Sequence, residues 1–306
     1  MRSEYDSHLL EVIVAFDAEG GDPRCEVLAA ADPRIRVVRG DPPGGKAATL
    51  NAGVRAARGT VLVFADTYQR FHPAAVRRLA AAVRDGGTPA ATGRLELPRG
   101  STGSLIRTYW KFERVLRRLE GRIHSPIGVT GAVYAVRREV WPSLPAGLIL
   151  DDVFVPLKLV LQGYRVAFVN DAYAFETRPS HDHLEYARKV RTLTGNFQLC
   201  ALLPGLLSPR RNPVWLQFVF HKLLRLTTPY LLLATTPWLA SEARHALRRL
   251  PKGVAVGLGV AVTGGMYFEP GTVLRCVSLL REGALLQAAV VRATWNGARG
   301  KWNVWS

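Results

Sequence analysis

The chain has 306 residues and a formal net charge of +17, and 48% of its residues are hydrophobic, enough for one large domain plus an appendage. This apolar content excludes a disordered basic tail, and the charge indicates an anionic partner: nucleic acid, a phospholipid surface or a phosphorylated substrate. Because Cys25, Cys200 and Cys276 are odd in number and far apart, we expect buried thiols in a reducing compartment, without disulfides or a zinc site. The first ten residues lack an apolar run, so no signal peptide or anchor is predicted there.

The first half of the chain alternates short β-rich runs with helical stretches, the pattern of a parallel sheet covered by helices. The predicted strands are residues 9–16, 35–39, 60–66 and 91–97, and the predicted helices are residues 47–57 and 73–85. Ligands of such open sheets bind beyond the carboxyl ends of the strands. Asp17 directly follows the first strand and Asp66 closes the third, so we expect both side chains to reach one crevice.

Two adjacent carboxylates, Asp151 and Asp152, lie at the start of an apolar helical stretch. A carboxylate pair at such a boundary suits acid/base catalysis or cation binding. Asp is also a favoured N-cap, and the helix dipole stabilises acids in the first turn, so the doublet alone leaves both interpretations open. The flanking predicted elements are a helix at 103–120, a Gly-bracketed loop and strand at 128–141, a strand at 165–169 and a basic helix at 185–200.

From residue 212 onward the chain is dominated by apolar segments, at residues 214–240, 253–268 and 273–295. Their uninterrupted runs are shorter than the ~20 residues that span a bilayer, so in-plane helices, tilted helices and full spans remain open. We predict that this region lies at a membrane, with a soluble amphipathic helical cap as the alternative. The basic residues of HKLLR, residues 221–225, are predicted to reach lipid phosphates at the interface.

Seven blocks, in order across residues 10–200, resemble membrane-associated glycosyltransferases of family 2. They are VIVAFDAEGGD, GGKAATLNAG, VLVFADTYQRF, YWKFE, GVTGAVYAVRRE, ILDDVFVPLKLVLQGYRVAF and RKVRTLTGNFQ. The resemblance implies an α/β fold of the A-type, a Rossmann-like mixed sheet that binds a nucleotide-diphospho-sugar, in residues 1–209. Residues 210–306 would form a membrane-associated helical region, which would include transmembrane helices and would place the catalytic domain at the cytoplasmic face of the cell membrane.

The same resemblance implies an inverting transfer of a sugar from a nucleoside diphosphate donor, UDP-linked, to a lipid-linked or polysaccharide acceptor. Asp152 would be the general base, with Asp151 beside it. The residues expected at the donor are Asp17 for the nucleobase, Asp66 for the ribose and a Mg²⁺ or Mn²⁺ ion, and Lys46 and Arg191 for the diphosphate. The residues expected at the acceptor are Gly128, Gly131, Ala132 and Arg188. Membrane lipids would be further partners, and nucleic acid would not.

The chain departs from the family pattern at three places. Only eight residues precede the first predicted strand, where the family has a further strand and an Asn-Glu turn, so we expect a sheet without that strand. Tyr68 stands where the metal motif has an acid or amide, and a phenol is a poor ligand for hard cations, so weak metal binding is expected. Arg188 and Thr192 replace the Gln and Trp of the Gln-x-x-Arg-Trp block.

Two alternatives follow from the residues themselves. Asp17 and Asp66 also suit structural turns and strand ends, and the departures above allow a non-catalytic membrane protein that retains the fold. A nucleic-acid binder is disfavoured because the sequence has no recognition motif and no aromatic stacking block.

Overall fold

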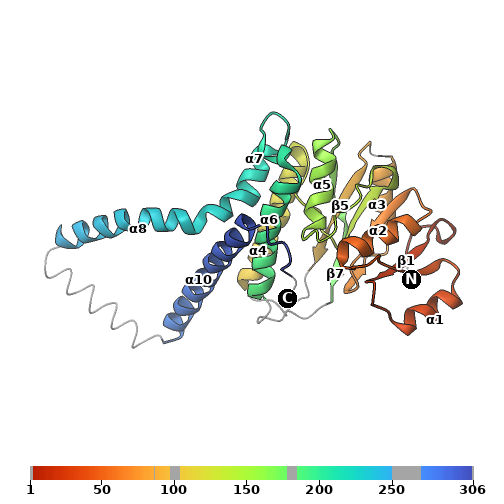
Figure 1. The fold of residues 1–306 in the computed structure, drawn as a ribbon, viewed down its shortest axis with the longest axis horizontal. Helices are drawn as coiled ribbons and strands as arrows, with labels where there is room; N and C mark the ends of the chain where they lie inside the picture. The colour runs from red at the N-terminus through yellow and green to blue at the C-terminus, as the bar shows by residue number, and fades with distance from the viewer. Residues whose placement is uncertain (1–2, 86, 97–103, 178–184, 250–269, 305–306) are drawn as a thin grey trace.

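The computed structural model describes residues 3–85, 87–96, 104–177, 185–249 and 270–304. An α/β body carries the N-terminus, and the long helices α8 (Leu224–Arg249) and α10 (Pro270–Ala298) extend from it (Figure 1). The chain therefore has the predicted order of an α/β unit followed by helices.

The strands form two sheets among the described residues. Strands β1 (Val12–Phe16) and β2 (Ile35–Arg39) pair in parallel and form a separate two-stranded sheet. The second sheet has the order β3-β6-β5-β7-β4, and its strands are β3 (Val61–Phe64), β4 (Gln69–Phe71), β5 (Ala90–Glu96), β6 (Tyr134–Arg137) and β7 (Val166–Glu176). Only the β5–β7 pair is parallel in this sheet. The all-parallel arrangement suggested by the alternating pattern is therefore wrong, and the mixed sheet implied by the resemblance is confirmed.

Two helices cover opposite faces of the larger sheet. Alternation along β6 sends Tyr134 and Val136 into the core with α5 (Asp151–Leu161), whereas Ala135, and Val133 just before the strand, join the core with α3 (Ala75–Arg84). Helix α5 is apolar on nearly all sides and almost wholly buried, so its first residues are held rigidly. Helices α1 (Pro23–Ala31) and α2 (Lys46–Ala56) pack against the small sheet.

A bulge in β5 links the sheet to the loop before β6. The β5–β7 register shifts between Thr92 and Arg94, and a side chain at Gly93 would overlap the carbonyl oxygen of Ala172. The bulge leaves the Thr92 hydroxyl to accept a 2.9 Å hydrogen bond from the backbone N–H of Thr130. The glycine therefore fixes the position of the loop that precedes β6.

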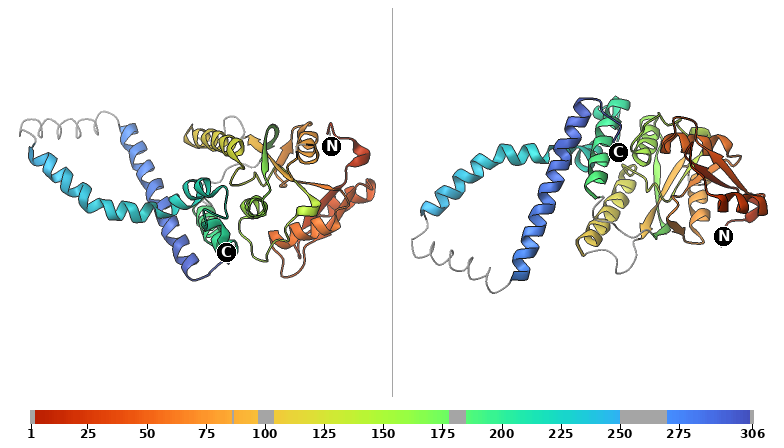
Figure 2. Two further views of the ribbon diagram at one scale, coloured as in Figure 1. Left: turned by 90° about the horizontal axis from the view of Figure 1, so that it is seen from above. Right: turned by 60° about the horizontal axis from the view of Figure 1, so that its bottom comes forward.

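The C-terminal helices pack against the α/β body at one end. Helix α6 (Glu185–Leu202) contacts α10 (Figure 2). Leu193 of α6 shares a small core with Leu226, Ala289 and Ala293. Helix α4 (Ser104–Ile123) contacts β7, and α7 (Trp215–Phe218) leads through a π-helical turn, Val219–Leu223, into α8.

The described helices include none that is both long and apolar enough to cross a membrane. The predicted apolar segment at residues 253–268 lies outside the described residues. Cys25 and Cys200 are free thiols, half-buried rather than fully buried, and the side chain of Cys276 lies outside the described part.

Candidate active site

Lys46 lies at the centre of a group of carboxylates. Its Nζ is 3.1 Å from Asp151 Oδ1 and 3.9 Å from Asp66 Oδ1. Lys46 opens α2, Asp66 follows β3 and Asp151 opens α5, so the side chains come from the ends of three separate elements. The crevice expected beyond the strand ends therefore contains a cation as well as the predicted acids.

The two adjacent aspartates differ in their surroundings. Asp151 is only 5% exposed and is paired with Lys46, whereas Asp152 is half-buried. A Cβ at Gly131 would lie 3.4 Å from Asp152 Cβ and 4.0 Å from its Oδ2. The glycine therefore leaves open space beside the Asp152 carboxylate, and the backbone oxygen of Asp152 accepts a 2.9 Å hydrogen bond from Val129.

The charges of this group shift each other's pKa values. Burial raises the pKa of Asp151 to about 6, the ion pair with Lys46 opposes that rise, and the neighbouring Asp152 adds to it. Burial also lowers the pKa of Lys46, but the carboxylates of Asp151, Asp66 and Asp152 outweigh it, so the pKa is raised overall. Lys46 is therefore a fixed positive charge at neutral pH.

Asp17 contacts the turn that precedes Lys46. Its Oδ1 accepts hydrogen bonds from the backbone N–H groups of Gly45, at 2.7 Å, and Ala18, at 2.8 Å. Gly44 and Gly45 have φ values of 90° and 89°, which favour glycine, and a side chain at Gly44 would overlap Asp17 Oδ1. Asp17 thus stabilises the turn that precedes Lys46. Its role toward a nucleobase stays a prediction.

The charges of both aspartates act on Arg191 of α6. Burial and the charge of Arg188 lower the pKa of Arg191, while Asp152 and Asp151 oppose that change, so Arg191 lies within electrostatic reach of both acids. The approach of α6 depends on Gly195, because a Cβ there would lie 2.5 Å from Leu150 Cγ. The structure thus brings Lys46, Asp66, both aspartates and Arg191 together.

The predicted acceptor residues are not equally accessible. Gly131 borders Asp152, but Gly128 and Ala132 are buried, and a Cβ at Gly128 would lie 3.4 Å from Val153 Cγ2 of α5. Gly128 therefore makes room for α5, and Gly131 is the member of this loop next to the carboxylate.

Sequence reasoning missed Tyr134, which appears as one more apolar strand residue. Its ring is fully buried, lies 4.6 Å from that of Phe64, and carries a hydroxyl without a hydrogen-bond partner among the described residues. Burial raises the pKa of Tyr134, and the charges of Asp151 and Asp152 raise it further, which places the phenol near both acids. The available signal was a polar-tipped aromatic immediately after the Gly-rich loop.

The prediction that His221 and Lys222 reach lipid phosphates is wrong. His221 Nδ1 lies 2.7 Å from Glu120 Oε1, and its Nε2 lies 3.2 Å from Glu113 Oε2. Lys222 is only 8% exposed. His221 points into the protein because Glu113 and Glu120 on α4 offer it two buried partners, and the charge of Glu113 also favours the neighbouring Lys222.

The residues around Asp66 suit a cation that is coordinated both by this carboxylate and by the phosphates of a ligand. Among the described residues no three His, Cys, Asp or Glu side chains are placed to hold a metal ion. Asp66 is an accessible carboxylate, and Tyr68 is exposed at the position that the family gives to a second ligand. Magnesium commonly takes one or two carboxylates plus substrate phosphates, so Asp66 alone fits Mg²⁺ or Mn²⁺ bound together with a diphosphate.

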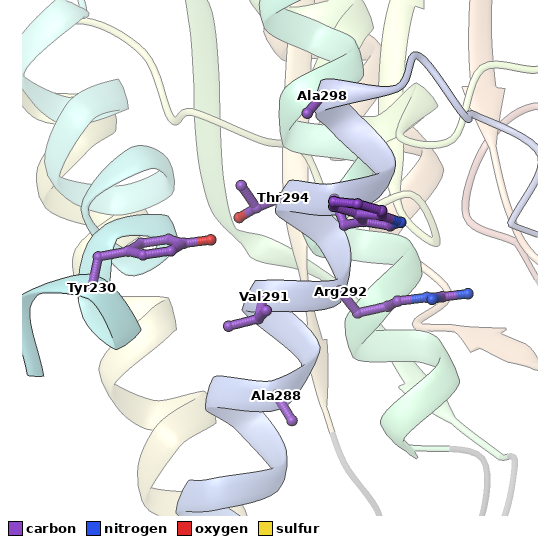
Figure 3. Close-up of a pocket in the computed structure, with 7 residues that line it drawn as sticks. Tyr230, Ala288, Val291, Arg292, Thr294 and Ala298 are labelled. Atoms are coloured by element: carbon purple, nitrogen blue, oxygen red, sulfur yellow. The ribbon is translucent and has the colours of Figure 1, made fainter. Parts of the chain in front are cut away.

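A separate cavity of about 590 Å³ lies between α8 and α10 (Figure 3). Its lining residues are Tyr230, Ala288, Val291, Arg292, Thr294, Trp295 and Ala298. The lining includes none of the acids around Lys46.

Comparison with known proteins gives a family and a fold. Residues 2–195 match the family described as "Glycosyltransferase like family 2". The mannosyltransferase PcManGT from Pyrobaculum calidifontis, solved with GDP-Man and Mn²⁺, aligns with a TM-score of 0.67 and 20% identity, over 98% of this chain and 81% of that chain. GalNAc-T7 with UDP, GalNAc and Mn²⁺ aligns with a TM-score of 0.47 and 14% identity, over 65% and 43% of the two chains. S. aureus TarS with UDP-GlcNAc aligns with a TM-score of 0.40 and 15% identity, over 64% and 60%. No curated protein matches the chain.

Proposed function

The chain belongs to the glycosyltransferase like family 2 and has the A-type fold, and from this premise we propose an inverting sugar transfer from a nucleoside diphosphate donor. The proposed acceptor is lipid-linked or a polysaccharide, and the proposed place is the cytoplasmic face of the cell membrane. The observation that carries the proposal is the convergence of Asp66 and Asp151 on Lys46, beside Asp152. A charged crevice of this composition suits a diphosphate and a proton transfer.

Asp152 is the proposed general base. It takes the proton of the acceptor hydroxyl while the hydroxyl oxygen bonds to the anomeric carbon, and the bond from that carbon to the diphosphate breaks with its electrons leaving on the diphosphate. Asp151 is less suited, because it is buried and held by Lys46, whereas Asp152 is half-buried and faces the space beside Gly131. Asp151 instead positions the Lys46 ammonium.

Lys46 and Arg191 are the proposed partners of the departing diphosphate. Their positive charges interact with the acids of the crevice and would stabilise the negative charge that develops on the leaving group. Asp66 would hold a divalent ion, which when bound supplies further positive charge to the diphosphate oxygens. The complex of PcManGT with GDP-Man makes GDP-mannose a candidate donor beside the UDP-sugars that the sequence suggested.

Release of nucleoside diphosphate tests the proposal. The full chain in neutral detergent is given UDP-sugars and GDP-mannose with Mn²⁺ or Mg²⁺ and a polyprenyl-linked or oligosaccharide acceptor. We expect Asp152→Asn to reduce acceptor-dependent release by a factor of about 10²–10⁴, because the base is lost while the shape is kept. The matched control is Asp171→Asn, an exposed aspartate on β7, which should retain release.

Full release by Asp152→Asn would reject the assignment of the base. Calorimetry with UDP and GDP in the presence of Mn²⁺ separates the enzyme from the non-catalytic alternative. Binding of a nucleotide supports the enzyme, and heats of dilution for both nucleotides support a chain that has kept only the fold.

A further inference from the structure

His221 lies between two glutamates of α4, and each of its ring nitrogens contacts one of them. Nδ1 lies 2.7 Å from Glu120 Oε1, and Nε2 lies 3.2 Å from Glu113 Oε2. The side chains of His221, Glu113 and Glu120 are only 8%, 9% and 4% exposed, so water solvates them little. A neutral imidazole has one N–H group, whereas the protonated ring donates from both nitrogens. Two ionised glutamates at these distances therefore require a ring that carries both protons.

Arg117 supplies the second positive charge of this buried group. Its Nε donates a 3.1 Å hydrogen bond to Glu113 Oε1. Burial raises the pKa of Glu113, but the hydrogen bond from His221 and the charge of Arg117 outweigh burial and lower it to about 2. Burial lowers the pKa of His221, as does the charge of Lys222, yet the hydrogen bonds to the two glutamates raise it overall. The charges of Arg225 and Arg117 act in turn on Lys222.

The same group holds the segment 127–130 at both ends. Glu120 Oε2 accepts a 3.1 Å hydrogen bond from the backbone N–H of Ile127. Arg117 Nη1 donates a 2.9 Å hydrogen bond to Thr130 Oγ1. The loop before β6 is therefore tied to α4 by the two charged side chains that His221 and its partner glutamate keep in place.

This loop in turn contacts the proposed base. The backbone N–H of Val129 donates a 2.9 Å hydrogen bond to the carbonyl oxygen of Asp152, and Gly131 borders the Asp152 side chain. A displacement of the loop would therefore change the surroundings of the Asp152 carboxylate.

His221 reaches the loop from the C-terminal part of the chain. It lies in the π-helical turn between α7 and α8, beyond the residues 2–195 that match the family. Single π-helical turns are frequent at functional sites. Gln217 of α7 donates a further 3.3 Å hydrogen bond, from Nε2, to the backbone oxygen of Glu120. The segment that leads into α8 thus contacts α4 at the same glutamate that holds the loop.

We propose that His221, protonated on both ring nitrogens, is a positioning residue that fixes residues 127–131 beside Asp152. The inference rests on the proposed function, because it takes Asp152 as the base. His221 acts through the two glutamates rather than on the reacting atoms. When the ring loses one proton, one buried carboxylate loses its donor, which is unfavourable, so the loop should loosen as the pH rises.

Amide hydrogen exchange of the full chain in a neutral detergent tests the placement of the loop. His221→Gln is expected to speed exchange in residues 127–131 at least about tenfold at pH 6.5, because a neutral amide does not compensate the second carboxylate. The matched control is His245→Gln, at an exposed position of α8, which should leave exchange unchanged. NMR spectra of the imidazole nitrogens should show both nitrogens of His221 protonated at pH 6.5, in signals that His221→Gln lacks.

Glu120→Gln separates the charge from the shape of the contact. Its amide can accept from the Ile127 N–H and donate to Nδ1 of a neutral imidazole, so the contacts survive without the second proton. In the unsubstituted protein, protection of the loop should fall as the pH rises above 6.5 and through the pKa of His221. In Glu120→Gln this fall should be absent.

The kinetics of sugar transfer give a further readout. His221→Gln should lower kcat about 10–100-fold, because the base is misplaced, and should leave KM for the nucleotide donor within about twofold. The kcat of the unsubstituted protein should decline on the alkaline side, and Glu120→Gln should remove that decline. Exchange and NMR need no turnover, so failure of this inference and failure of the proposed function are independent results.

Three results would overturn the inference. They are a singly protonated His221 ring at pH 6.5, a Glu120→Gln variant that keeps the pH dependence of the loop, and a His221→Gln variant whose exchange rises equally throughout the chain. The last result would mean that His221 serves stability alone. Glu120→Gln and the NMR spectra decide the question should His221→Gln not fold.

Discussion

Lys46 is the cation that pairs with the acids of the crevice. It holds the buried Asp151 at 3.1 Å and approaches Asp66 at 3.9 Å. Lys46→Met should weaken binding of a nucleoside diphosphate about 10–100-fold, because a charge-assisted contact to phosphate is lost while two carboxylates that repel it remain. Calorimetry with UDP and GDP measures the effect, and Lys111→Met, an exposed lysine on α4, is the control. Unchanged affinity would remove Lys46 from the donor site.

Lys222 gives the stability of the protein a defined pH dependence. Burial, together with the charges of Arg225 and Arg117, lowers its pKa from 10.5 to about 8. Between these values the unfolded chain binds more protons than the folded chain, so this residue's contribution to the free energy of unfolding rises with pH. Below about pH 8 both states are protonated, and the cost of the buried charge is fully present.

Lys222→Met removes this dependence. Because the variant lacks the buried charge, its free energy of unfolding should exceed that of the unsubstituted protein. The difference should be largest below pH 8 and should shrink by about 1–2 kcal/mol between pH 8 and pH 9.5. Urea unfolding of both proteins across this range measures the difference. An advantage that does not change with pH would mean that folding does not lower the pKa of Lys222.

The site could be predicted where residue type and position carried the signal. Asp66 follows a strand, so the strand-end rule found it, and Asp151 was found as one of two adjacent acids at the start of an apolar helix. Lys46 belongs to one of the sequence blocks that carry the family resemblance. Tyr134 and Lys222 could not be found in this way. The environment of Tyr134 depends on carboxylates from other segments, and Lys222 is buried because of a π-helical turn and a pair of glutamates on α4, none of which leaves a local pattern.

At the level of elements, the strands with continuous apolar runs were predictable. Residues 35–39 coincide with β2, and residues 91–97 differ from β5 by one residue. Helix α1 was not predicted because it buries no side chain completely and so lacks an apolar face. Strand β4 was missed because it has three residues and exists through its pairing with β7. The antiparallel partners of β6 depend on contacts distant in sequence, which the alternating pattern does not contain.

Helix α6 packs closely against the residue that precedes α5. A Cβ at Gly195 would lie 2.5 Å from Leu150 Cγ, and Leu150 directly precedes Asp151. Gly195→Val should lower the free energy of unfolding by about 1–3 kcal/mol and reduce diphosphate release, since the start of α5 must move. Gly283→Ala in α10 meets no atom within 4 Å and should instead raise stability by about 0.5–1 kcal/mol. Chemical unfolding measures the stability of both variants, and the release assay measures their activity. Unchanged release in Gly195→Val would show that the packing of α6 does not influence the acids.

The whole molecule combines a basic charge with an apolar helical arm. The net charge is +17, and α8 exposes large apolar side chains that an aqueous protein would normally cover. They are Leu231, Leu232, Leu233, Trp238 and Leu239. The same helix carries exposed arginines in its last turns, Arg244, Arg248 and Arg249. Apolar insertion plus attraction to anionic lipid headgroups is the physical basis of interfacial binding.

We therefore expect the protein to bind vesicles that contain phosphatidylglycerol more tightly than vesicles of phosphatidylcholine alone, with part of the preference lost as salt rises. The double variant Leu232→Asn with Leu239→Asn should reduce binding to either vesicle at least about tenfold, because each leucine contributes about 1.5–3 kcal/mol when fully buried. Cosedimentation with vesicles measures the bound fraction.

Leu9→Asn is the control for this experiment, because Leu9 is 70% exposed but lies in the N-terminal α/β body. If replacing any exposed leucine weakened vesicle binding, Leu9→Asn would weaken it as much as the double variant does. If α8 inserts into the lipid, only the double variant should lose binding. Since α8 extends away from α2, which carries Lys46, a variant that no longer binds vesicles should still bind UDP or GDP. Equal vesicle binding by all three proteins would show that α8 is covered by something other than lipid.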